Sequence, residues 1–217
     1  MPLKLYNYWR STSSYRTRIL LNLKGVPWEY VPVNIREGEQ HGEAYRAISP
    51  NGFVPVLVDG DTIVRQTVLI TEYLDQKFPD KPLVPTNAAG RTRVMEFLLS
   101  LTGDVQGRTQ KRVRDYIEEH LSRDDLLRWF DFWSAEGLAI LESLATEGRP
   151  AGRFFHGDKP GAADAFLMAQ LFNYGQRGID LAQAPTLKAI GEECAKLEEF
   201  EKAKPDNQPD YAPDPRF

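Results

Sequence analysis

The sequence has little cysteine and little histidine. Its one cysteine, Cys194, leaves no internal disulfide framework, so a reducing cytoplasm is the expected environment. The three histidines, at positions 41, 120 and 156, do not share a metal-ligand spacing. These shortages argue against a disulfide-stabilised secreted protein, and we expect no metal site.

Long apolar runs are also missing. No stretch approaches the roughly 18 apolar residues that suggest a membrane-spanning helix, and the opening MPLKLYNYW lacks a signal-peptide pattern. The net charge is −4 over 217 residues, which offers no general basic surface. We therefore expect neither a nucleic-acid nor a membrane partner. The length suffices for one large domain or two small ones.

Several catalytic signatures are absent. The chain has no GxSxG, Walker A loop, GxGxxG, HExxH or CxxC. These absences argue against phosphate-binding NTPases, Rossmann oxidoreductases, zinc enzymes and dithiol redox proteins. The missing CxxC matters most, because a thioredoxin-like unit would carry it near the start of its first helix, where this chain has Ser11-Thr12-Ser13-Ser14.

The first 80 residues predict a β-α-β-α-β-β-α order. The expected strands are 3–8, 28–33, 54–58 and 62–65, and the expected helices are 14–24, 43–48 and 67–78. The first two strands should be parallel, and the Asp59-Gly60 turn predicts a hairpin of the last two. This order is compatible with a small thioredoxin-like α/β domain.

The remainder of the chain predicts only helices. A segment rich in proline and glycine, 79–90, follows the last strand-containing region and reads as a linker. Helices are expected at 91–119, 123–146, 163–175 and 186–200, with an extended tail from Lys204. The predicted organisation is a thioredoxin-like domain at 1–80, a linker at 81–90 and an all-helical domain with the substrate pocket at 91–217.

A cluster of hydroxyls marks the start of the first helix, in WRSTSSYRTRILL (9–21). The first turn of a helix has unpaired backbone N–H groups and the positive end of the dipole, which bind anions and lower the pKa of a thiol. Arg10, Arg16 and Arg18 would add positive field. Serine and threonine are also the commonest N-caps, so a purely structural role stays open.

Three other segments suggest ligand contacts. Pro55, after Val54, could follow a cis peptide that exposes the Val54 backbone, or lie on an ordinary edge strand. Gln66 precedes Thr67, a candidate N-cap of a second helix that could hold a carboxylate or be a plain cap. The cationic run 108–114 fits either a solvated helix face or a pocket for a dianion.

Taken together, the chain resembles the zeta-class glutathione transferases, and among them the maleylpyruvate and maleylacetoacetate isomerases. The similar segments are YNYWRSTSSYRTRILLNLKGVPWEYVPV, NGFVPVL, QTVLITEYL, GDKPGAADAFLMAQLFN and a terminal QPD. The resemblance implies the glutathione transferase fold, a homodimer and glutathione as cofactor.

The resemblance also implies roles for individual residues. It places Ser11, Thr12 and Ser13 around the glutathione sulfur, and it implies that Asp104 reaches glutathione across a dimer interface. The other residues implied to bind glutathione are His41 at its glycyl end, Val54 before cis-Pro55 at its cysteinyl backbone, and Gln66 and Thr67 at its γ-glutamyl carboxylate.

The chain departs from the family pattern in three places. Ser13 stands where many relatives have cysteine, which excludes redox chemistry through an enzyme thiol there. Gln106-Gly107-Arg108 replaces a His/Gln-Pro-Leu/Ile segment. Residues 174–177, Tyr-Gly-Gln-Arg, replace Ala-Arg-Arg-Phe, so we expect a carboxylate-binding arginine to be missing.

Three functions compete. The first is a glutathione-dependent cis–trans isomerase of an unsaturated dicarboxylate, with Arg10, Lys111, Arg112 and Arg108 as candidates for binding the dianion and Arg10 also assisting catalysis. The second is a transferase that conjugates or cleaves another electrophile and consumes glutathione. The third is a non-catalytic binding module on the same fold.

Overall fold

A four-stranded sheet organises the N-terminal part of the chain. The computed structural model describes residues 2–148, 150 and 152–213, and within them the strand order is β2-β1-β3-β4. The strands are β1 (Leu3–Asn7), β2 (Trp28–Pro32), β3 (Val56–Asp59) and β4 (Thr62–Arg65). The predicted parallel pair β1–β2 and hairpin β3–β4 are both confirmed.

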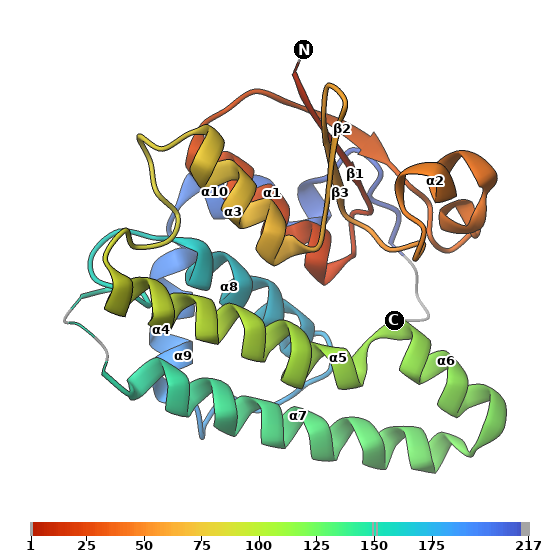
Figure 1. Ribbon diagram of the computed structural model, residues 1–217. Coiled ribbons are helices and arrows are strands. Elements are labelled where there is room, and N and C mark those ends of the chain that lie inside the picture. Colours follow the sequence, from red (N-terminus) through yellow and green to blue (C-terminus); the bar gives the residue numbers. More distant parts are fainter. Residues whose placement is uncertain (1, 149, 151, 214–217) are drawn as a thin grey trace.

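Helices cover both faces of this sheet (Figure 1). Helices α1 (Thr12–Lys24) and α3 (Thr67–Lys77) pack together on one face, and α2 (Glu43–Ile48) covers the other after a 3-10 turn at Glu39–His41. The alternation of strand side chains explains both contacts. Leu5 and its neighbour Leu57 enter the main core, whereas Val56 packs against Tyr45 of α2. The thioredoxin-like fold is confirmed.

The hydroxyl-rich segment forms the start of α1, two residues earlier than predicted. Ser11 is the N-cap, and its Oγ accepts a hydrogen bond from the Ser14 backbone N–H at 3.2 Å. At the other end, Gly25 adopts a left-handed φ of 66° and donates its N–H to Leu21 and Asn22 carbonyls. Capping at both ends therefore defines α1.

The C-terminal domain is helical. Its helices are α4 (Ala88–Leu99), α5 (Gln106–Thr109), α6 (Lys111–His120), α7 (Arg123–Thr146), α8 (Ala162–Gly175), α9 (Pro185–Cys194) and α10 (Glu198–Ala203), with a π-helical turn at Ser100–Val105. Helix α8 packs against α1, which joins the two domains through one continuous core (Figure 1). Cys194 is buried in that core.

Two predicted helices are each broken in the structure. The segment 91–119 is not one helix, because the backbone becomes extended at Gln110 (ψ 160°) and α6 starts afresh. The segment 186–200 is divided at 195–197, since α10 must turn to pack Phe200 and Ala203 against α1. Apolar spacing continues across both breaks and therefore hides them.

The tail is not simply extended. A 3-10 turn at Pro205–Asn207 follows α10, and the buried Gln208 side chain donates to the carbonyls of Lys202 and Lys204 at 2.9 and 2.7 Å. The tail then contacts the N-terminal domain, where Asp210 accepts a hydrogen bond from the Trp9 N–H. Long-range hydrogen bonds order a segment whose composition predicted none.

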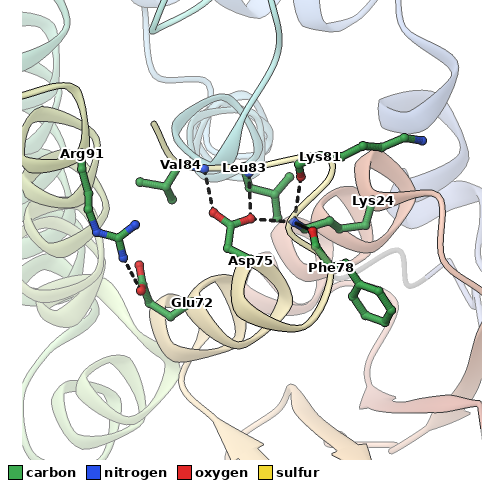
Figure 2. Close-up of polar contacts among 8 residues, drawn as sticks. All are labelled: Lys24, Glu72, Asp75, Phe78, Lys81, Leu83, Val84 and Arg91. Carbon is green, nitrogen blue, oxygen red and sulfur yellow. Dashed lines mark hydrogen bonds and ion pairs between the residues drawn. The ribbon is translucent and has the colours of Figure 1, made fainter. Parts of the chain in front are cut away.

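A buried ion pair fastens the linker between the domains (Figure 2). Lys24 Nζ lies 2.7 Å from Asp75 Oδ1 and is fully buried. The remaining bonds of this pair reach the linker backbone: the carbonyls of Phe78 and Lys81 accept from the ammonium, and the N–H groups of Leu83 and Val84 donate to the carboxylate. Glu72 of α3 also pairs with Arg91 of α4. The predicted linker 81–90 thus has defined contacts, and its last three residues belong to α4.

Candidate functional site

A cavity of about 880 Å³ lies between the two domains. Its walls come from the segments that precede α1, β3 and α3 and from α6, α7 and the end of α8. Most residues singled out in the sequence line it: Arg10, Ser11, Thr12, Ser13, His41, Val54, Pro55, Gln66, Thr67, Lys111 and Arg112. Residues separated by about a hundred positions therefore meet in one cavity.

One end of the cavity is formed by the start of α1. Ser11, Thr12 and Ser13 line the wall at half-buried positions. Ser14 is fully buried instead, and its Oγ accepts from the Tyr8 N–H at 3.3 Å. The four hydroxyls thus divide: Ser14 has a structural role, Ser11 is a cap that also lines the cavity, and Thr12 and Ser13 face it from the first helical turn.

The arginines inside α1 lie away from the cavity wall, contrary to one expectation. Arg18 is buried and binds backbone carbonyls, including that of Trp9 at 2.9 Å. Arg16 is stacked on the Phe166 ring at 4.6 Å and donates to Gln106 Oε1, and burial lowers its pKa. Because Gln106 lines the cavity, Arg16 supports the wall from behind.

A second helix start reaches the same cavity. Gln66, not Thr67, occupies the N-cap position of α3, so the predicted cap was wrong by one residue. Gln66 has a left-handed φ of 69°, a conformation that side chains other than glycine rarely adopt. Thr67 is the first helical residue, and both residues line the cavity. The Val54–Pro55 peptide bond is cis, as the family resemblance implied.

His41 lies at the edge of the cavity, on an exposed position. Arg46 Nη2 lies 3.1 Å from His41 Nδ1, and the Gln40 amide nitrogen lies 3.0 Å from Nε2. Both neighbours orient the ring, which belongs to the last residue of the 3-10 turn before α2.

Three arginines of the cavity wall influence one another electrostatically. Arg10, Arg114 and Arg177 all line the cavity, and the Arg177 guanidinium stacks on the Phe130 ring at 3.8 Å. Desolvation by the surrounding protein, and then the positive charges of Arg114 and Arg10, lower the pKa of Arg177 to about 10. Such crowding of like charge favours an anionic ligand with more than one carboxylate.

Arg114 and Arg177 were not among the predicted site residues. Within the segment 174–177, where we expected a carboxylate-binding arginine to be missing, Arg177 follows the end of α8 and lies in the cavity wall. Arg114 could have been found, since it shares a helix face with Lys111. Arg177 could not, because its position depends on how the chain leaves α8.

Lys111 and Arg112 line the cavity but already have protein partners. Lys111 Nζ pairs with Asp115 at 2.6 Å. Arg112 donates to the Asn51 carbonyl, and its guanidinium lies 4.0 Å from the centre of the Phe53 ring. Arg112 therefore connects α6 with the loop before β3, and all three residues line the cavity.

Arg108 and Asp104 lie outside the cavity. The Arg108 guanidinium stacks on the Trp133 ring at 4.4 Å, and Nη1 donates to the Asp104 carbonyl. The Asp104 side chain is exposed. The structure therefore does not support Arg108 as a residue that binds the substrate.

The chain's own thiol does not line the cavity. Cys194 is buried, and desolvation raises the pKa of its thiol. Among the residues that the structure describes, no group of three or more metal-binding side chains gathers, and no helix has the length and apolar character needed to cross a bilayer. A reactive sulfur in the cavity would have to come from a ligand.

Comparisons with known proteins agree with this arrangement. Residues 5–82 match the family model "Glutathione S-transferase, N-terminal domain". The chain is 34% identical to the maleylpyruvate isomerase of a Ralstonia species, over 97% of this chain and 100% of that protein. It is 38% identical to a zeta-class glutathione S-transferase of Euphorbia esula, over 96% and 92% of the two chains.

A solved structure gives the same result. The maleylacetoacetate isomerase of Anaeromyxobacter dehalogenans, with dicarboxyethyl glutathione and citrate bound in its active site, superposes with a TM-score of 0.87. The two sequences are 37% identical, and the alignment covers 100% of this chain and 96% of that isomerase. The chain therefore belongs to the zeta-class glutathione transferases, the family of enzymes that includes the maleylpyruvate and maleylacetoacetate isomerases.

Proposed function

We propose that this protein is a glutathione-dependent cis–trans isomerase of an unsaturated dicarboxylate of the maleylpyruvate or maleylacetoacetate type. The observation that carries the proposal is the cluster of Arg10, Arg114 and Arg177, which share a cavity with the start of α1. The start of α1 suits a thiolate, and the arginine cluster suits carboxylates. The relatives that share a fold with this chain include one with dicarboxyethyl glutathione bound.

The residues present fit glutathione. The N-termini of α1 and α3, helices of 13 and 11 residues, both open into the cavity and suit the tripeptide's anionic groups. Thr12 and Ser13, with the Ser11 cap, would hold the sulfur. The remaining contacts are assigned to the Val54 backbone for the cysteinyl part, Gln66 and Thr67 for the γ-glutamyl carboxylate, and His41 for the glycyl end.

The chain's own groups would perform three tasks. Bound glutathione supplies the thiolate, whose reversible addition turns the double bond into a rotatable single bond. The first turn of α1 and its hydroxyls stabilise the thiolate and so keep the sulfur deprotonated. Arg10, Arg114 and Arg177 hold the two carboxylates and stabilise the negative charge that develops on the substrate carbonyl. Elimination then restores the thiolate, so no glutathione is consumed.

We further propose that the protein works as a homodimer in the cytoplasm. Leu69 of α3 and Leu99 of α4 are 57% and 55% exposed, and their contact with a second copy would remove them from water. Asp104, also exposed, would then reach the partner's glutathione. Sedimentation equilibrium tests the dimer, and a mass equal to one chain at micromolar concentration would contradict it.

The decisive assay supplies maleylpyruvate or maleylacetoacetate with a catalytic amount of glutathione. We expect many turnovers for each glutathione, and full recovery of the free thiol at the end. Loss of one thiol per turnover with another electrophile would instead indicate a conjugating transferase. No turnover of either dicarboxylate would refute the isomerase, and failure to bind glutathione in calorimetry would leave only a binding module.

A further inference from the structure

The tail of the chain contacts the turn that leads into the active site. We call residues 8–11 the active-site turn. The Ser11 N–H donates to the Tyr8 carbonyl at 3.1 Å, which closes the turn, and Ser11 then caps α1. Arg10 projects from the same turn into the cavity. The position of this turn therefore sets where the first turn of α1 and the Arg10 side chain lie in the cavity.

Helix α1 holds one side of the turn. Arg18 is fully buried and donates to the Trp9 carbonyl at 2.9 Å and to the Tyr8 carbonyl at 3.4 Å. Its Nε also donates to the Ala203 carbonyl at 3.0 Å, at the end of α10. Arg18 thus joins the turn to the last helix of the other domain.

Asp210 holds the other side of the turn. Its Oδ2 accepts from the Trp9 N–H at 3.1 Å, and its Oδ1 accepts from the Tyr30 hydroxyl of β2. The next residue, Tyr211, packs edge-on against the Trp9 ring at 4.9 Å. Trp9 is 4% exposed, so without Asp210 a buried peptide N–H would lose its partner.

We propose that Asp210 is a positioning residue for the active site. It holds the Trp9 peptide so that the first turn of α1 points at the bound thiol, and it acts without touching the ligand, since it does not line the cavity. The effect on the thiol rests on the proposed function. A helix start that is free to rotate or fray directs its N–H groups less well, and the thiol it binds becomes less acidic.

Three substitutions separate position from charge. D210A removes both hydrogen bonds and the charge, whereas D210N removes only the charge, because its amide can still accept from the Trp9 N–H and donate to the Tyr30 oxygen. D206A is the matched control, since Asp206 is an exposed carboxylate in the 3-10 turn four residues earlier. Circular dichroism and thermal unfolding confirm that each variant is folded.

The readout is the pKa of enzyme-bound glutathione, followed by the ultraviolet absorbance of the thiolate. We expect D210A to raise this pKa by about 1, a tenfold weaker acid, and D210N and D206A to leave it unchanged or slightly lower. Loss of a nearby negative charge alone would lower the pKa, so the expected rise has the opposite sign. An unchanged or lowered pKa in D210A would overturn the proposal.

Two further measurements keep the test decisive. Amide hydrogen exchange over residues 8–11 in the ligand-free protein should be faster in D210A and unchanged in D210N, and equal rates would contradict the positioning role. If the wild type did not bind glutathione, the proposed function would fail, and exchange alone would decide whether Asp210 holds the turn. If D210A did not fold, Y30F would replace it, with a smaller rise of the thiol pKa expected and no rise overturning the proposal.

Discussion

Replacing Arg177 by methionine tests the arginine cluster directly. Methionine keeps an unbranched apolar side chain that can still pack on Phe130, so the main loss is the charge. A hydrogen bond to a charged group contributes about 1.5–3 kcal/mol, which corresponds to a roughly 10- to 150-fold loss in kcat/KM. Because the substitution also relieves repulsion with Arg10 and Arg114, we expect a value near the lower end.

Arg108 provides the matched control for this experiment. It also stacks its guanidinium on an aromatic ring, that of Trp133, but it lies outside the cavity. We expect R108M to keep kcat/KM within about twofold, consistent with the small effect of most surface substitutions. The assay is initial-rate isomerisation of maleylpyruvate at saturating glutathione, with calorimetry to show that R177M still binds glutathione normally.

The outcome of R177M distinguishes two roles for the cluster. If Arg177 holds a carboxylate, kcat/KM falls while the glutathione Kd stays the same, and the ligand-free variant is at least as thermally stable as the wild type. An unchanged kcat/KM in R177M, or a larger loss in R108M than in R177M, would refute the assignment of the dianion to this arginine cluster.

The remaining predictions concern stability. K24M should lower the free energy of unfolding by about 3 kcal/mol in urea titrations, because it removes the cation from the Asp75 carboxylate, which is 12% exposed and keeps only its bonds from the Leu83 and Val84 N–H groups. K4M, which breaks an exposed pair, should leave the urea midpoint nearly unchanged. G137A should cost about 1–3 kcal/mol, since a Cβ there would lie 2.6 Å from Val105 Cγ1, and an unaltered melting temperature would show that the π-helical turn yields easily. Desolvation, and then the charge of Arg93, lower the pKa of His156 in the folded protein. The unfolded chain therefore binds a proton at His156 more tightly than the folded protein does, and the free energy of unfolding decreases as the pH falls through about 6.5. H156N should flatten this acid-side slope of the melting temperature between about pH 7 and 5, and an identical slope would assign the effect to other groups.

The sequence predicted the sheet and its flanking helices well. Strand alternation in 3–8 and the Asp59-Gly60 hairpin are local patterns, and the structure has both. The hydroxyl residues Ser11, Thr12 and Ser13 likewise predicted a helix start, because serine and threonine are common N-caps. Local patterns do not report where a helix must break, so the kink at Gln110 was missed.

The division between sequence and tertiary structure is clearest at the hydroxyl cluster. The sequence by itself determined that a helix starts at a run of hydroxyls and that no cysteine stands there, because both follow from residue type and short-range spacing. Only the tertiary structure decided which side chains from other segments lie beside this helix start and in its cavity. It turned Arg16 and Arg18 away from the cavity, brought Arg177 in from the end of α8, and placed Asp210 against Trp9. Those contacts join residues up to 201 positions apart, and packing between domains, which no local pattern encodes, sets them.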